Sequence, residues 1–91
     1  MILAKPQSIY SFVTIINDIN TMDEKTLFFK IGKKIQEIRE SQNMTQDDLS
    51  AKSNLDNIGR IETGNTNPTI RTLYKISQAL KVKLKDLVNV E

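Results

Sequence analysis

The sequence has no cysteine, no histidine and no tryptophan, and it has only three glycines and two prolines among its 91 residues. Without cysteine and histidine there can be no disulfide, no thiolate or imidazole metal ligand, no cysteine nucleophile and no histidine base of a serine hydrolase triad. We therefore expect no enzyme activity, no bound metal and no cofactor. The short length allows one small core and excludes a multidomain enzyme.

Neither sign of charge dominates, since thirteen Lys and Arg residues stand against eleven Asp and Glu residues and the net charge is +2. This balance permits a nucleic-acid partner without requiring one, because binding depends on where the cations lie. No run approaches the roughly 18 apolar residues of a membrane span, and the first residues lack the pattern of a secretory signal. We expect a cytoplasmic protein without membrane contact.

The first 22 residues differ in composition from the rest. They carry only two charges, Lys5 and Asp18, and residues 8–19 are rich in β-branched and aromatic side chains in partial alternation. This stretch predicts one strand, which must pair with another strand, such as its copy in a second subunit, or stay disordered. We divide the chain into an N-terminal extension, residues 1–22, and a domain, residues 23–91. A domain that starts at Met22, preceded by residues from an upstream start codon, is a further possibility.

The sequence after this point has helical periodicity. A helix is predicted over about residues 23–42, where apolar side chains recur at three- and four-residue steps: Leu27, Phe28, Ile31, Ile35 and Ile38. A second helix, at about residues 46–52, follows the hydroxyl N-cap Thr45. Asn54 is suited to the left-handed conformation of a sharp turn.

Three further helical segments complete the domain. The third helix is expected to begin after Asp56, a good N-cap, and to stop at Gly64. Thr69 is expected to cap the fourth helix, whose inward stripe is predicted to be Ile70, Leu73, Ile76 and Leu80. A last helical turn is predicted to cover the bottom of the core with Leu84, Leu87 and Val88. These segments predict a compact all-α domain of five helices.

Several ordered pieces of the sequence resemble the phage-repressor-like helix-turn-helix family of bacterial regulators, the lambda and 434 repressor-like or XRE-type proteins. They are residues 44–50 (MTQDDLS), 61–64 (IETG), 67–69 (NPT) and 73–80, within a match over about residues 28–88. The resemblance implies that helices two and three form the helix-turn-helix, with helix three in the major groove of double-stranded DNA. It implies a transcriptional regulator, most plausibly a repressor that acts as a homodimer on a near-palindromic operator.

The resemblance also assigns DNA contacts to individual residues. Gln46 begins helix two, where free backbone N–H groups can meet a phosphate while its amide reaches a base or helix three. Arg60 projects from helix three toward a phosphate or a guanine edge. Contacts with the DNA phosphate backbone are implied for Asn65, Thr66, Asn67, Arg71 and Lys75, with Lys52 a weaker candidate. The alternative for each is an ordinary surface, capping or turn residue.

Two charged residues match positions that have a structural role in the family. The resemblance implies that Arg39, near the end of helix one, and Glu62, near the end of helix three, form a partly buried ion pair. Loss of binding on mutation of Arg39 would then not prove a DNA contact, because one buried charge would be left without its partner.

The third helix departs from the family pattern. Between Gln46 and Glu62 the chain has about two residues fewer than the pattern, and the gap falls between Asp56 and Ile58, where the family mainly reads bases. Three explanations are open: a deletion that shortens the recognition helix, a changed turn length that preserves it, or two residues absent from the recorded chain. Asn57 is the remaining candidate for reading adenine, while Asp56 suits an N-cap.

Two points therefore stay open at the level of the sequence. The alternative to a DNA-binding regulator is a protein-interaction module that keeps the scaffold but has lost base reading. The dimer surface is either the N-terminal strand or the outer face of helices four and five, with Tyr74, Leu84 and Val88. No small-molecule ligand is evident, since so small a core leaves little room for one.

Overall fold

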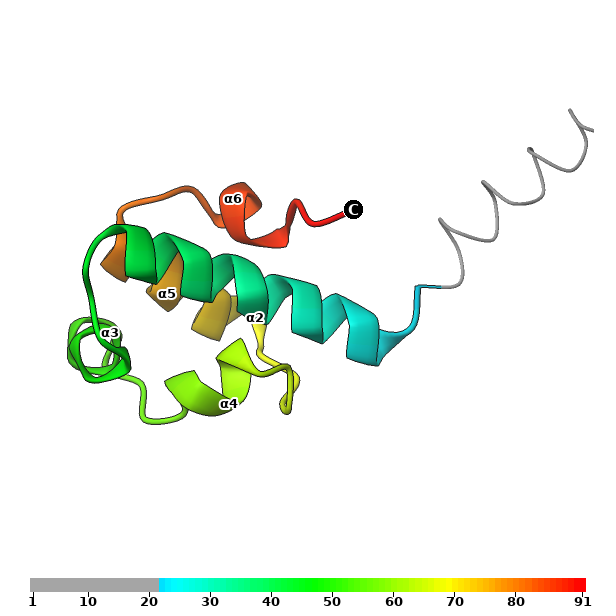
Figure 1. Ribbon diagram of the computed structural model, residues 1–91, viewed down its shortest axis with the longest axis horizontal. Helices are drawn as coiled ribbons and strands as arrows, with labels where there is room; N and C mark the ends of the chain where they lie inside the picture. The colour runs from blue at the N-terminus through cyan, green and yellow to red at the C-terminus, as the bar shows by residue number, and fades with distance from the viewer. Residues whose placement is uncertain (1–21) are drawn as a thin grey trace, which may run out of the picture.

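The computed structural model describes residues 22–91, which form five α-helices and no β-strand (Figure 1). The helices are α2 (Glu24–Ser41), α3 (Gln46–Ser53), α4 (Ile58–Glu62), α5 (Ile70–Leu80) and α6 (Leu84–Val88). The predicted all-α class is confirmed for this part of the chain. The strand predicted in the N-terminal extension lies outside the described residues.

Helix α2 begins and ends close to the predicted positions. Its N-cap Asp23 accepts a hydrogen bond from the backbone N–H of Thr26 at 2.8 Å. Its apolar face packs into the core, with Ile31 and Ile35 buried. Leu27 and Ile38 pack against the core, whereas the half-buried Phe28 is outside it, so four of the five predicted stripe residues face the other helices. Each end of the helix lies within one residue of its prediction.

Helix α3 has a complete capping box, which explains why it forms despite its eight residues. The Thr45 hydroxyl accepts from the Asp48 backbone N–H at 3.0 Å, and the Asp48 carboxylate accepts from the Thr45 N–H at 2.9 Å. The helix ends at Asn54, whose φ of 57° is in the left-handed region as predicted. Two orphan N–H groups at the start of α3 are thus satisfied.

Helix α4 begins later than predicted and is only five residues long. The expected N-cap, Asp56, is wrong: the N-cap is Asn57, whose side chain makes no capping hydrogen bond. Ile58 is nevertheless 3% exposed, so the helix starts with its first apolar side chain in the core. Helix α4 therefore has five residues and keeps both of its apolar side chains, Ile58 and Ile61, in the core.

The last two helices contain two errors of the sequence prediction. Thr69 caps α5 as predicted, but Ile70 is 67% exposed and does not join the core. Ile70 is the first residue of α5, and helical side chains point back toward the N-terminus, so it extends beyond the packed face. In α6, Leu87 is fully buried, whereas Val88 is 38% exposed. Consecutive side chains of a helix point about 100° apart, so the residue after Leu87 turns away from the core.

One core joins all five helices. In Figure 1 the long helix α2 crosses the domain, with α6 on one side, α3 and α4 on the other, and α5 behind it. The core side chains are Ile31, Ile35, Met44, Leu49, Ile58, Ile61, Leu73, Ile76, Leu80 and Leu87. Within the described part of the chain, no helix is both long enough and apolar enough to cross a membrane.

Candidate nucleic-acid interface

The helix-turn-helix unit is tied to α2 by a buried ion pair. Arg39 donates from Nε to Oε2 of Glu62 at 2.6 Å and from Nη2 to Oε1 at 3.1 Å. Its Nη1 donates to the carbonyl oxygen of Met44 at 2.6 Å. Both side chains are buried, and the hydrogen bond to Glu62 raises the pKa of Arg39 above its usual value. The last residue of α4 is thus fixed against the end of α2.

Gln46 joins the same cluster from the start of α3. Its amide nitrogen Nε2 donates to Oε1 of Glu62 at 2.9 Å. A single carboxylate therefore connects the first residue of α3 and the last residue of α4 to α2. The amide of Gln46 reaches helix α4, one of the two positions expected for it from the sequence.

The backbone of α4 also lies directly against α2, because Gly32 has no side chain. A Cβ atom at Gly32 would lie 2.4 Å from the carbonyl oxygen of Ile61 and 2.5 Å from that of Glu62. Gly64 has a φ of 77°, and a Cβ atom there would lie 2.8 Å from the Cα atom of Phe29. The C-terminal end of α4 is therefore held in place by backbone contact as well as by the ion pair.

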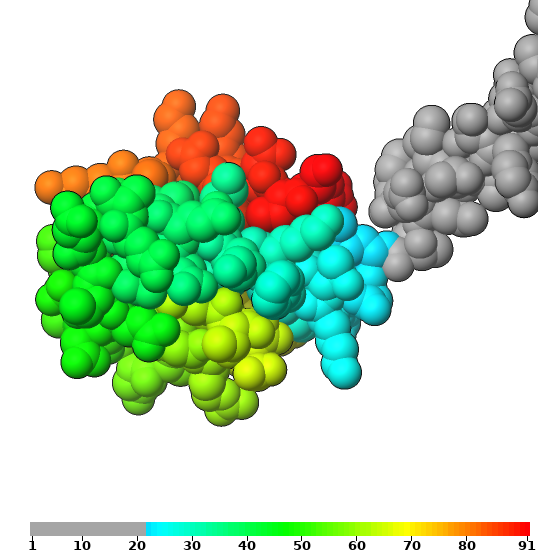
Figure 2. Space-filling model, in the orientation of Figure 1, coloured from blue at the N-terminus to red at the C-terminus, as the bar shows by residue number. Residues whose placement is uncertain are grey.

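The turn after α4 folds back onto the exposed side of that helix. Arg60 is exposed and donates from Nη2 to the carbonyl oxygen of Asn65 at 3.4 Å. The amide of Asn65 donates to the Thr63 hydroxyl at 3.0 Å. In Figure 2, α4 and the following turn, in yellow-green and yellow, form the lower edge of the molecule beside the green surface around α3. The contacts join Arg60 and Asn65 into one polar surface beside Gly59 and Gln46.

The remaining candidates make no hydrogen bond to this surface within residues 22–91. Asn57 precedes α4 and is half-buried, Thr66 is half-buried, and Asn67 is exposed. Arg71 and Lys75 stand four residues apart on one face of α5. Within residues 22–91, no hydrogen bond or ion pair links Arg71, Lys75 or Lys52 to the cluster. Their assignment to DNA contacts stays a prediction.

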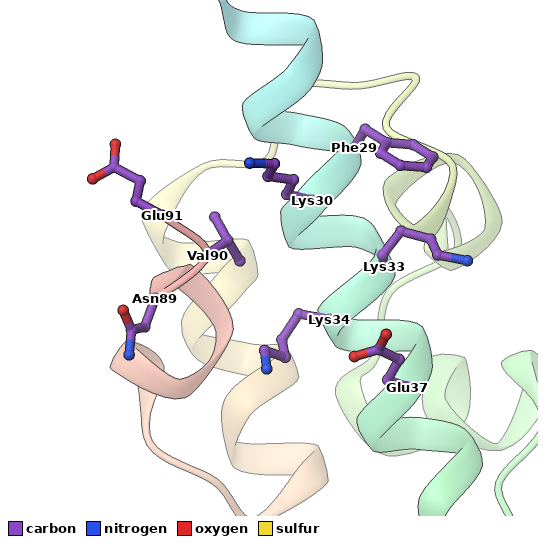
Figure 3. A pocket seen from close by; sticks show the side chains of 8 residues that line it. All are labelled: Phe29, Lys30, Lys33, Lys34, Glu37, Asn89, Val90 and Glu91. Carbon is purple, nitrogen blue, oxygen red and sulfur yellow. The ribbon is translucent and has the colours of Figure 1, made fainter. Parts of the chain in front are cut away.

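A separate open groove of about 420 Å³ lies between α2 and the C-terminal residues. Figure 3 shows Lys30 and Lys34 on the side of α2 that faces Asn89 and Val90, with Lys33 and Phe29 on the other side of the helix. The groove lies at the surface and is lined largely by charged side chains, so it is distinct from the buried core.

Two glycines were missed as candidates. Gly32 and Gly59 set the distance of α4 from α2 and from the Gln46 amide, respectively. The available signal was their position inside segments of helical periodicity, where glycine costs about 1 kcal/mol relative to alanine and so indicates close packing.

A helix-turn-helix held rigidly on a five-helix scaffold, with a polar outer edge, defines a DNA-binding domain. The family model described as Helix-turn-helix, HTH_3, matches residues 35–87, and the chain belongs to this family. Its relatives are helix-turn-helix transcriptional regulators, a family of DNA-binding proteins that are not enzymes. The predicted family is confirmed.

Three known proteins are similar to this chain. An uncharacterised HTH-type transcriptional regulator from Sinorhizobium fredii is 33% identical over 60 residues, which are 64% of this chain and 78% of that protein. The restriction-modification controller protein C.AhdI from Aeromonas hydrophila is 27% identical, with a TM-score of 0.65 over 66% of this chain and 94% of the other. An HTH_3 family regulator from Vibrio cholerae shares the fold, with a TM-score of 0.68 and 24% identity over 71% of this chain and 38% of the other.

Proposed function

We propose that the protein is a sequence-specific repressor that binds a near-palindromic operator as a homodimer. The observation that supports this proposal is the arrangement of polar side chains around α4: Gln46 joins the start of α3 to α4 through Glu62, and the exposed Arg60 bonds to Asn65 in the turn that follows. In helix-turn-helix proteins this surface enters the major groove, and a two-fold dimer places its half-sites about 10 base pairs apart.

Within this proposal the contacts divide into two kinds. Arg60 and Asn57 face base edges, since a guanidinium suits guanine and an amide suits adenine. The turn residues and α5 hold the phosphate backbone through Asn65, Thr66, Asn67, Arg71 and Lys75. Removal of a phosphate contact should weaken binding to all DNA sequences alike and should lower the salt dependence of binding.

Selection from a randomised duplex library with the purified full chain, followed by salt titration of the enriched duplex, tests the proposal. We expect an enriched near-palindrome and an affinity that falls steeply with salt. Arg60→Ala should weaken that duplex and relax one base preference, whereas Lys85→Ala, an exposed cation on α6, should not. Weak binding of all duplexes alike would contradict the proposal and favour a protein-interaction module.

A further inference from the structure

We propose that the open groove between α2 and the C-terminal residues binds an acidic segment of a partner protein. The segment carries carboxylates that face Lys30 and Lys34 and an apolar side chain that packs on Phe29. This activity goes beyond DNA binding and does not depend on the operator proposed above. Its support is the charge, the apolar content and the position of the groove.

Three lysines lie close together on α2 without a partner charge. Lys30, Lys33 and Lys34 all line the groove, and within residues 22–91 none of them forms an ion pair. Lys30 and Lys34 are one helical turn apart, and like charges at this spacing repel each other. Figure 3 shows both on the side of α2 that faces Asn89 and Val90. Carboxylates placed between these ammonium groups would relieve the repulsion.

Two apolar side chains line the same groove. Phe29 is 52% exposed, and Val90, from the C-terminal residues, is half-buried. Phe29 stands one helical turn before Lys33, so a ligand can contact an aromatic ring and an ammonium group together. Exposed aromatic side chains are enriched at protein–protein interfaces. The groove therefore favours a partner that brings both negative charge and an apolar group.

The lining and the shape of the groove distinguish a protein segment from other anions. Glu37 and Glu91 also line it, and they would repel a phosphate backbone, which carries negative charge along its whole length. A peptide can place carboxylates at the lysines and neutral or basic residues at these glutamates. The groove is open to solvent, whereas small-molecule sites bury most of their ligand. Charge and shape therefore both favour a segment of a protein.

The spacing of the lysines matches the repeat of a peptide chain. The four residues from Lys30 to Lys34 span about 6 Å along the helix axis. Two residues of an extended chain span about 6.6 Å, and their side chains point to the same face. Carboxylates at alternate positions of an extended segment are therefore spaced to meet both lysines.

The groove is separate from the proposed DNA interface. None of its lining residues belongs to α3, α4 or the turn between α4 and α5. In Figure 1, α6 lies on the opposite side of α2 from α3 and α4. A copy bound to DNA through its helix-turn-helix therefore keeps this surface free for a protein.

Selection from a randomised peptide library displayed on phage, with the immobilised full chain, tests the proposal. We expect enriched peptides with Asp or Glu at alternate positions and an apolar residue beside them. Fluorescence anisotropy then measures the affinity of one enriched peptide made by synthesis. No enrichment, or enrichment of peptides without acidic residues, would overturn the proposal.

Matched double substitutions locate the peptide on the surface. Lys30→Gln combined with Lys34→Gln should weaken peptide binding roughly tenfold or more, because both charge contacts are lost. Lys52→Gln combined with Lys81→Gln changes the net charge equally, at two exposed lysines outside the groove, and should bind like the wild type. Phe29→Ser should weaken binding without a change of charge. Equal affinities of the two double variants would show that net charge alone attracts the peptide and would overturn the proposal.

A duplex of unrelated sequence distinguishes a protein site from a phosphate site. It should leave the peptide bound, and its own affinity should be the same for the wild type and the variant with Lys30→Gln and Lys34→Gln. Displacement of the peptide, or weaker duplex binding by this variant, would overturn the proposal in favour of a phosphate contact. If no operator is enriched but the peptide binds as expected, the proposed DNA function is wrong and the protein-binding groove stands.

Discussion

At the scale of the residue, Arg39 and Glu62 have a role in folding that is easily mistaken for a role in DNA binding. We predict that Arg39→Ala lowers the free energy of unfolding by about 3 to 5 kcal/mol, because it leaves the Glu62 carboxylate buried without its partner. Urea denaturation followed by circular dichroism measures this loss. Lys33→Ala, at an exposed position of the same helix, is the control and should change the value little. An Arg39→Ala protein as stable as the wild type would show that the pair is not structural.

Two capping carboxylates give the stability a dependence on pH. The pKa values of Asp23 and Asp48 lie below their usual range, chiefly because the backbone N–H groups of Thr26 and Thr45 donate to the ionised carboxylates. A group whose pKa is lower in the folded than in the unfolded chain stabilises the fold above its unfolded pKa, and this contribution disappears as the pH falls through the folded pKa.

We therefore predict that the melting temperature of the wild type falls more steeply below about pH 4 than that of Asp48→Asn, which has no charge to lose. Thermal melts between about pH 7 and pH 2 compare the two proteins. Asp47→Asn, for which no capping bond is present, should follow the wild-type curve. Parallel curves for the wild type and Asp48→Asn would contradict the prediction.

The sequence predicted some residues of the site better than others. The Arg39 and Glu62 pair followed from the family resemblance because both positions lie within the match over about residues 28–88. The sequence predicted that the Gln46 amide reaches a base or helix three, but not that its partner is Glu62, because this contact depends on how closely α4 approaches α3. Spacing along the chain does not contain that distance.

At the scale of the element, the C-terminal end of α4 is fixed by backbone contact with α2. We predict that Gly32→Ala destabilises the domain by about 1 to 3 kcal/mol, since the new Cβ meets backbone carbonyls that cannot rotate away. Equilibrium denaturation measures the change. Gly59→Ala is the matched variant, because its Cβ meets only the flexible Gln46 side chain, and it should not destabilise. Equal behaviour of the two alanines would show that the close approach at Gly32 is unimportant.

The capping box makes α3 dependent on Thr45. Replacing Thr45 by alanine removes the acceptor for the Asp48 N–H and should cost about 1 kcal/mol of stability. Thr66→Ala, in the turn before α5, serves as the control because its side chain makes no hydrogen bond within residues 22–91. The same denaturation experiment checks both, and an unchanged midpoint for Thr45→Ala would contradict the role of the cap.

Helix positions were predicted well where periodicity and caps agreed, as in α2, α3 and α5. The start of α4 was misplaced because Asp56 is a strong N-cap by composition, whereas burial of Ile58 determines where the helix begins. Ile70 and Val88 were placed in the core because periodicity gives the angle of a side chain around a helix. It does not show whether a neighbour covers the end of that helix.

At the scale of the whole molecule, the five helices share one core. We predict that a chain starting at Met22 folds with the same helical content as the full chain, because the core and the caps all lie within the described residues. Circular dichroism checks folding, and light scattering checks assembly. Where the full chain is the proposed homodimer, a truncated chain that is also dimeric would place the dimer interface on the helices. A monomeric truncated chain would place that interface in the N-terminal extension. A truncated chain that does not fold would contradict the domain boundary.

The attachment of α4 at its C-terminal end has a consequence for how such regulators diversify. Its anchors are the Glu62 cluster and the backbone contact at Gly32, and both act at the end of the helix. Residues can therefore be gained or lost between Asn54 and Ile58 while the anchored end keeps its place. This turn is a position where descendants of one ancestral protein can acquire new operators in a few mutational steps without first repairing their fold.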